Sequence, residues 1–76
     1  MSTLVKRSFS LAGHRTSVAL EPEFWAALSA IAVRDGMTLS ALVGQTDAAR
    51  EAERPLASAL RVMALRDSRG ALTERK

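Results

Sequence analysis

Two stretches of the first 20 residues alternate between apolar and polar positions. The first covers residues 5–11, and the second, which is richer in β-branched side chains, covers residues 15–20. A period of two is typical of β-strands, because successive side chains of a strand point to opposite faces. Gly13 interrupts the pattern between the two stretches. We therefore predict two strands, which either form a hairpin around Gly13 or leave the first strand as a loose arm.

A helix is predicted to begin at about Pro22, directly after the second strand. Proline suits the first helical position because its missing N–H would have no partner there, and Glu21 and Glu23 favour the positive end of the helix dipole. The apolar residues that recur with helical spacing are Phe24, Leu28, Ile31 and Ala32, with Trp25 beside them. This stripe predicts the face of the helix that is buried.

A tight turn and a second helix are expected next. Gly36 supplies the left-handed conformation that commonly ends a helix, and Thr38 is a good N-cap for the following one. The apolar stripe of the second helix contains Leu39, Leu42, Val43 and Thr46. We expect this helix to end near Glu53, because Pro55 disfavours helical geometry in the residue before it.

A short third helix is predicted from about Leu56 to Arg66. Its apolar face consists of Leu56, Ala59, Leu60 and Met63. The tail from Asp67 to Lys76 contains Gly70 and several charged residues, and we expect it to be frayed.

The composition restricts how so small a fold can be stabilised. A chain of 76 residues buries only ~60% of the surface that its unfolded state exposes, so a lone monomer is marginal. The chain has no cysteine and one histidine, His14, which excludes disulfide frameworks, Cys-based zinc sites and haem attachment. We predict no cofactor and no metal. The simplest source of further buried surface is a twofold homodimer in which strand 15–20 pairs antiparallel with its copy. One strand and two helices are too few to cover all the large apolar residues, so we expect the two copies to share a core that contains Val18, Leu20, Trp25, Leu28, Ile31, Leu42 and Val43.

Charge is distributed unevenly along the chain, whose net charge is +3. Residues 1–20 have three basic residues and no acidic one, residues 21–53 carry a net charge of −4, and residues 54–76 carry +4. The two basic ends indicate a polyanionic partner, although basic segments are often only solvated surface. No apolar run approaches the ~20 residues that a membrane helix needs, and the start lacks the pattern of a signal peptide. We expect a cytoplasmic protein without a membrane partner.

Three features follow one another in residues 14–50: the strand 15–20, the apolar helix that starts at Pro22, and the turn Gly36-x-Thr38-x-Ser40. In this order they resemble the ribbon-helix-helix superfamily of DNA-binding proteins. The resemblance implies a mainly α fold with a short β-ribbon, built as an intertwined dimer. The predicted parts are an N-terminal strand or basic arm (1–13), a ribbon-helix-helix core (14–53), and a short C-terminal helix with a frayed basic tail (54–76).

The resemblance also implies double-stranded DNA as the partner. In this family the two-stranded ribbon enters the major groove, outward strand side chains read base edges, and the start of the second helix contacts a phosphate. Carried onto this sequence, the expected DNA-binding residues are Lys6, Arg7, His14, Arg15, Ser17, Thr38 and Ser40. Arg15 can hydrogen-bond guanine. We predict a sequence-specific transcriptional regulator that acts as a homodimer or as a tetramer of two dimers.

The extra segment 5–11 departs from the family pattern, in which the ribbon usually lies close to the start of the chain. If residues 5–11 pair beside the ribbon, a dimer has four strands, whereas the major groove admits two, and the ribbon is blocked or displaced. If they form a flexible arm, Lys6 and Arg7 add phosphate or minor-groove contacts.

Two other classes of function compete with this interpretation. Catalysis is not expected, because the acidic residues 47, 51 and 53 have no base, glycine-rich phosphate loop or metal motif nearby. The alternative is an oligomeric protein-interaction module of the same fold that does not read DNA, which includes an antitoxin-like role. Individual residues also have structural explanations: Thr38 and Ser40 as helix caps, and Phe24 and Trp25 as dimer core.

Overall fold

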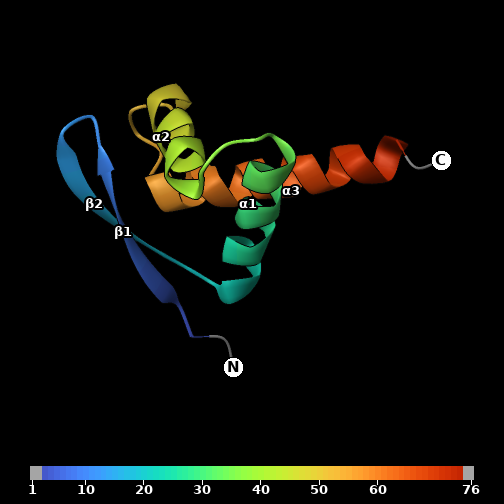
Figure 1. The fold of residues 1–76 in the computed structure, drawn as a ribbon, viewed down its shortest axis with the longest axis horizontal. Helices are drawn as coiled ribbons and strands as arrows, with labels where there is room; N and C mark the ends of the chain where they lie inside the picture. The colour runs from blue at the N-terminus through green and yellow to red at the C-terminus, as the bar shows by residue number, and fades with distance from the viewer. Residues whose placement is uncertain (1–2, 75–76) are drawn as a thin grey trace.

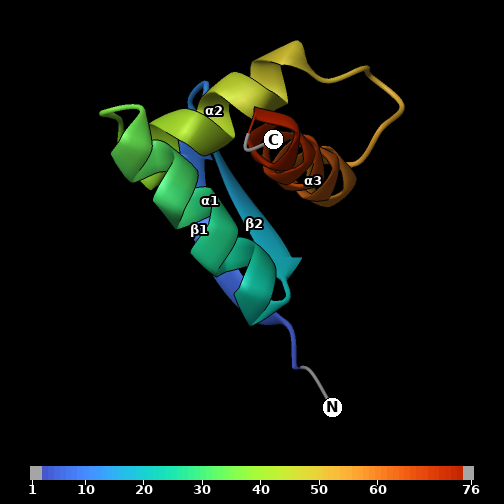
Figure 2. The ribbon, with the colours of Figure 1, turned by 90° about the vertical axis from the view of Figure 1, so that its right-hand side faces the viewer.

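The computed structural model describes the backbone of residues 3–74 and the side chains of residues 3–67. Its elements in chain order are β1 (Val5–Leu11), β2 (His14–Leu20), α1 (Pro22–Arg34), α2 (Leu39–Ala49) and α3 (Leu56–Glu74) (Figure 1). The two strands form a hairpin, and the helices lie on one side of it (Figures 1 and 2). The order of strands and helices therefore agrees with the sequence prediction.

The β1–β2 hairpin is antiparallel, with a register that runs from Leu11 opposite His14 to Val5 opposite Leu20. Its two turn residues, Ala12 and Gly13, have φ values of 51° and 82°. Positive φ at both central residues is the geometry whose twist matches that of paired strands. Residues 5–11 are thus one strand of a hairpin, and the loose-arm alternative is wrong.

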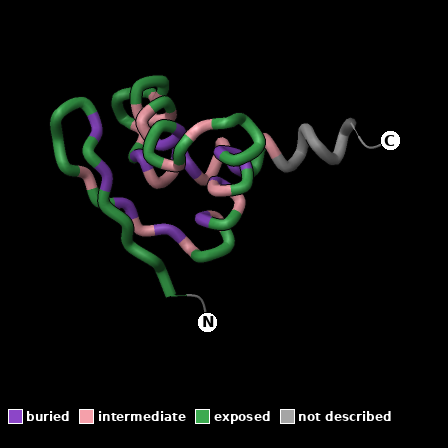
Figure 3. The backbone as a smooth tube through the Cα atoms, in the orientation of Figure 1, coloured by how far each residue is buried: buried purple, intermediate pink, exposed green. Residues whose placement is uncertain are grey.

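The core lies between the inner face of the hairpin and the three helices (Figure 3). Leu20, Leu28, Val43 and Leu60, one from each of β2, α1, α2 and α3, are its most completely buried members. The large apolar residues that led us to expect a core shared between two chains are covered within one chain: Val18, Leu20, Trp25, Leu28, Ile31, Leu42 and Val43. That part of the dimer argument is wrong, because β1 and α3 supply the cover that a second copy was expected to supply.

The junction between α1 and α2 has the geometry that its sequence predicts. Gly36 has a φ of +68°, and the N–H of Met37 donates to the carbonyl of Ala32 at 2.9 Å. The Oγ1 atom of Thr38 accepts a hydrogen bond from the N–H of Ala41 at 3.0 Å. The Gly36 turn and the Thr38 cap are both confirmed.

The ends of the last two helices differ from the prediction. α2 ends at Ala49 rather than near Glu53, because the side chain of Arg50 bonds the carbonyl of Arg54 at 2.8 Å and organises the connecting loop. α3 is a 19-residue helix that continues to Glu74, so the prediction of a short helix that stops at Arg66 is wrong. An ion pair of 2.8 Å between Arg34 and Asp67 ties this part of α3 to α1. The predicted frayed tail from Asp67 is also wrong up to Glu74, because the helix includes these residues, and its last part, residues 75–76, lies outside the described residues.

A second ion pair joins the start of α1 to α3. The guanidinium of Arg61 lies 3.0 Å from the carboxylate of Glu21 and 5.8 Å from the ring centroid of Phe24. A backbone hydrogen bond at Glu21 and, next in size, the hydrogen bond from Arg61 lower the pKa of the Glu21 carboxyl. Phe24 therefore packs against Arg61 and the core of its own chain, and not in a core shared by two chains.

Within residues 3–74, no single helix is long and apolar enough to cross a membrane. The pair α1 and α2 is long and apolar enough when the two helices are counted together, but they are bent by 100° relative to each other.

Candidate nucleic-acid interface

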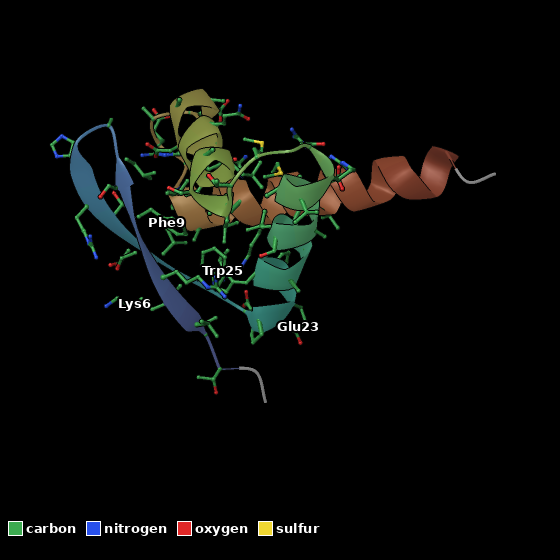
Figure 4. All side chains as sticks on the ribbon, in the orientation of Figure 1. Lys6, Phe9, Glu23 and Trp25 are labelled. Carbon is green, nitrogen blue, oxygen red and sulfur yellow. The ribbon has the colours of Figure 1, made fainter. Side chains whose placement is uncertain are left out.

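The outward face of the hairpin is polar and basic. Because alternate residues of a strand point to opposite faces, the burial of Phe9, Leu11, Val18 and Leu20 fixes which residues point outward. The outward cross-strand pairs are Lys6 with Ala19, Ser8 with Ser17, and Ser10 with Arg15. Figure 4 shows Lys6 directed away from the helices, whereas Phe9 is directed toward them. Neither strand contains an acidic residue.

The charges on this face are available to a partner. Within residues 3–67, neither Lys6 nor Arg15 forms an ion pair with a carboxylate. The hydroxyl oxygens of Ser8 and Ser17 lie 3.2 Å apart, and both side chains are exposed. A guanidinium, an ammonium and a row of hydroxyls are the groups that bond base edges and phosphates in protein–DNA contacts.

Arg7 lies on the other face of β1 from Lys6. Its guanidinium carbon is 5.2 Å from the centroid of the Trp25 ring, and the indole N–H of Trp25 donates to the carbonyl of Val5 at 2.8 Å. Phe9 packs against the same ring, with the two centroids 5.9 Å apart. Arg7 therefore covers the edge of the core, and a DNA contact by Arg7 stays a prediction.

The remaining predicted residues lie at the two ends of the hairpin–helix unit. His14 is exposed beside the hairpin turn, directly before Arg15 in β2. Thr38 and Ser40 are exposed at the start of α2, whose first turn has no acidic residue. The positive end of that helix dipole is thus not offset by a carboxylate on the same turn. The structure therefore brings Lys6, Arg15 and Ser17 together on the outward face and places Thr38 and Ser40 apart from them at the start of α2. Arg7 and His14 belong to neither group, because their strand positions face the same side as the buried Val18 and Leu11.

Sequence reasoning left Ser8 and Ser10 out of the predicted site, although they share the outward face with Lys6. Their alternation with buried residues is the signal that could have identified them. Among the described residues, there is no group of three or more His, Cys, Asp or Glu side chains that could hold a metal ion.

Comparison with known proteins identifies the fold family. Residues 4–68, from just before β1 to the middle of α3, match the family model described as Ribbon-helix-helix domain. The chain belongs to the ribbon-helix-helix domain family. This ribbon-helix-helix domain is similar to a solved structure, that of an uncharacterized protein from Bordetella pertussis Tohama I, with a TM-score of 0.81 and 33% sequence identity. The match covers 99% of this chain and 63% of that chain. No curated protein matches the sequence.

The family assignment agrees with the resemblance found from the strand, the apolar helix and the Gly36 turn. The matched range also includes β1, so the hairpin strand that departs from the usual ribbon-helix-helix pattern lies inside the matched domain. This chain spans less than two thirds of the length of the solved chain that it resembles.

Proposed function

We propose that this ribbon-helix-helix protein is a DNA-binding transcriptional regulator whose β1–β2 hairpin contacts the major groove through its outward face. The observation that carries the proposal is an acid-free face on which Lys6 and Arg15 flank the hydroxyls of Ser8, Ser10 and Ser17. Membership of a family that generally binds DNA supports it. Arg15 is the only long outward side chain of β2, and we assign it the reading of guanine.

The proposed active unit is a homodimer formed along the open edge of β2. Each strand of a two-stranded sheet keeps one edge without a partner, and such an edge is a template for pairing with another chain. Antiparallel pairing of two β2 strands gives the order β1-β2-β2-β1. The open edges of the outer β1 strands offer a further contact by which two dimers form a tetramer.

The width of this sheet determines how it meets DNA. Four strands at a spacing of about 4.8 Å extend over about 14 Å, which exceeds the ~12 Å width of the major groove. The sheet therefore covers the mouth of the groove rather than entering it. In this position the central Arg15 side chains reach the bases, while Lys6 on each outer strand meets the flanking phosphates. The capped start of α2, at Thr38 and Ser40, is proposed as a further phosphate contact.

We propose that the protein binds DNA and catalyses no reaction. It acts in the compartment that holds the DNA, which agrees with the cytoplasmic location expected from the sequence. Its test is the affinity of the 76-residue chain for labelled duplexes, measured by fluorescence anisotropy at several salt concentrations. Selection from a random-sequence pool should first enrich a preferred duplex. Two copies of Lys6 and Arg15 supply four cations, so their contribution to the log–log salt slope should be no steeper than about −4.

Arg15→Ala is the decisive variant, and Arg66→Ala, which removes an exposed arginine from α3, is its matched control. Arg15→Ala should reduce the preference for the selected duplex over the random pool by about 1–3 kcal/mol, the size of a bidentate guanine contact. Arg66→Ala should leave that preference unchanged. The proposal is wrong if the chain binds no duplex at about 50 mM salt, where phosphate contacts are strong, or if the two variants have the same effect on the preference.

A further inference from the structure

A groove of about 530 Å³ lies between α2 and α3, away from both strands of the hairpin. Its walls come from α2, from the loop that follows it and from α3, and none of its lining residues belongs to β1 or β2. A ligand in this groove would therefore occupy a different surface from the outward face of the hairpin. The proposed DNA contact does not account for the groove.

The floor of the groove is apolar and lies open to solvent. Leu42 and Ala59 are buried beneath it, while Val62 and Met63 are partly exposed and Ala49 is exposed. Val62 is not among the described residues that pack against the core cluster, and the exposed part of its side chain lies in the groove. Met63 adds a flexible thioether that adapts to the shape of an apolar partner.

The rim of the groove carries two arginines that no carboxylate of the described side chains neutralises. Within residues 3–67, neither Arg54 nor Arg66 forms an ion pair, and the side chain of Arg54 has one hydrogen bond, to the hydroxyl of Ser58 at 3.2 Å. The third arginine, Arg50, is committed to the loop, because it pairs with Asp47 at 2.9 Å and bonds the carbonyl of Arg54 at 2.8 Å. The one carboxylate in the lining, that of Glu51, leaves the rim with a net positive charge.

We propose that this groove binds an acidic amphipathic helix of another protein. The walls are helices, whose backbone groups bond within the helix, so the groove has no strand edge to offer and must recognise side chains. An apolar floor with arginines on the rim is complementary to a helix that has apolar residues on one face and carboxylates beside them. α2, with 11 residues, is about 16 Å long, which matches about three turns of such a helix.

The proposal is tested with a synthetic peptide and the full chain. The probe is a fluorescein-labelled peptide of about 14 residues, with leucine at helical i, i+3, i+4 and i+7 positions and glutamate at most others. One control peptide has glutamine in place of every glutamate, and another has serine in place of every leucine. Anisotropy gives the dissociation constants, and amide chemical shifts of the labelled protein locate the bound peptide.

The double variant Arg54→Gln with Arg66→Gln should weaken binding of the acidic peptide by about tenfold or more, since charge-assisted hydrogen bonds are among the strongest contacts. Arg15→Gln, which removes one exposed arginine from the outward face of the hairpin, should change it less than about twofold. Each control peptide should bind more weakly than the probe. Because Arg54 has a structural hydrogen bond, Arg66→Gln alone serves as a second variant, with a smaller loss in the same direction.

Three results would overturn the proposal. One is that neither groove variant changes the affinity for the acidic peptide, or that the peptide shifts amide signals of the hairpin instead of those of α2 and α3. Another is a loss of duplex DNA affinity in the double variant as large as that in Arg15→Gln, which would make the groove part of the DNA surface. The last is dissociation of the homodimer by Arg66→Gln, which would make a second copy of the chain the occupant. Failure of DNA binding in the wild type leaves the peptide result unaffected, so the two proposals are tested separately.

Discussion

Ser8 and Ser17 face each other across the β1–β2 hairpin, with their hydroxyl oxygens 3.2 Å apart on its outward side. In a hairpin with a two-residue turn, the pair that flanks the turn is hydrogen-bonded, and the following pairs alternate. Counted from Leu11 and His14, Ser8 and Ser17 form a pair without mutual backbone hydrogen bonds. The N–H of Ser17 therefore points to the open edge of β2, and the N–H of Ser8 points to the open edge of β1.

This geometry gives a test of the proposed dimer edge. Ser17→Pro removes a donor from the open edge of β2 without removing one from the β1–β2 ladder, so we expect it to prevent dimerisation. Ser8→Pro makes the same change at the open edge of β1 and removes the same contact between the two hydroxyls. It should leave the dimer intact. Sedimentation velocity at micromolar concentration distinguishes dimer from monomer.

Thermal melting of both proline variants shows whether each still folds. The dimer through β2 is wrong if Ser8→Pro dissociates the protein and Ser17→Pro does not, a result that would move the interface to β1. A wild-type chain that stays monomeric at high concentration would contradict any homodimer.

Two glycines are expected to respond in opposite ways to substitution. Gly36 has a φ of +68°, and a Cβ there would meet nothing within 4 Å, so the cost of Gly36→Val is backbone strain, about 1–3 kcal/mol for a β-branched residue. Gly44 lies within α2, where a Cβ would make an ordinary contact of 3.7 Å with Leu11. Gly44→Ala should therefore stabilise the protein by about 0.5–1 kcal/mol. Urea unfolding of both variants measures the changes, and an unchanged midpoint for Gly36→Val would contradict the assignment of strain.

The local elements of this fold are largely predictable from the sequence because their signals are local. Alternation identifies both strands, Pro22 marks the start of α1, and Gly36 with Thr38 marks the turn before α2. The ends of α2 and α3 were less predictable, since they depend on side-chain contacts that the hydrophobic pattern does not show, one between near neighbours and one between distant residues. Arg50 closes the loop after α2, and Arg34 reaches Asp67 across the fold.

The candidate site was only partly predictable, for a related reason. Alternation predicts that Lys6, Arg15 and Ser17 occupy the polar positions of their strands. Only the pairing of β1 with β2 places all three on the same face of the hairpin. The same pairing buries the core within one chain, which a list of apolar residues could not reveal. The groove between α2 and α3 has no sequence signal, because its lining comes from two helices and the loop between them and forms one surface only after α3 packs.

The ion pair between Glu21 and Arg61 should make stability depend on pH in the acidic range. The pKa of Glu21 is lowered below its ordinary value of 4.5, so the folded state binds this proton less readily than the unfolded state. The resulting stabilisation is fully present above the ordinary pKa and is lost as the pH falls through the lowered one. Urea unfolding of the wild type and Glu21→Gln at about pH 7, 5 and 3 should give a difference that shrinks at the lowest pH.

Arg61→Gln provides the control for this pH dependence. It removes the ion pair but keeps the backbone hydrogen bond that also lowers the pKa, so it should retain part of the dependence. Other carboxyls, among them Asp35 beside Arg34, are common to all three proteins and cancel in the difference. A difference between wild type and Glu21→Gln that stays constant over this pH range would contradict the lowered pKa.

Lys6 and Arg7 are adjacent, yet their removal should have different consequences because they lie on opposite faces of β1. Lys6→Ala should weaken binding to all duplex sequences about equally and flatten the log–log salt slope of a dimer by about 1.8, the effect of two lost phosphate contacts. Its melting temperature should not change. Arg7→Ala should leave the slope unchanged and lower the free energy of unfolding by about 0.5–1 kcal/mol, since the guanidinium stacks on Trp25 at an exposed site.

Both variants remove one positive charge from β1, so a general electrostatic effect would appear equally in the two salt slopes. A slope that Arg7→Ala flattens as much as Lys6→Ala would therefore contradict the separate roles proposed for the two faces of β1. A slope that neither variant changes would remove β1 from the DNA surface. The proposed contact would then narrow to Arg15 and Ser17 on β2, because the outer strands would lie beyond the reach of the flanking phosphates.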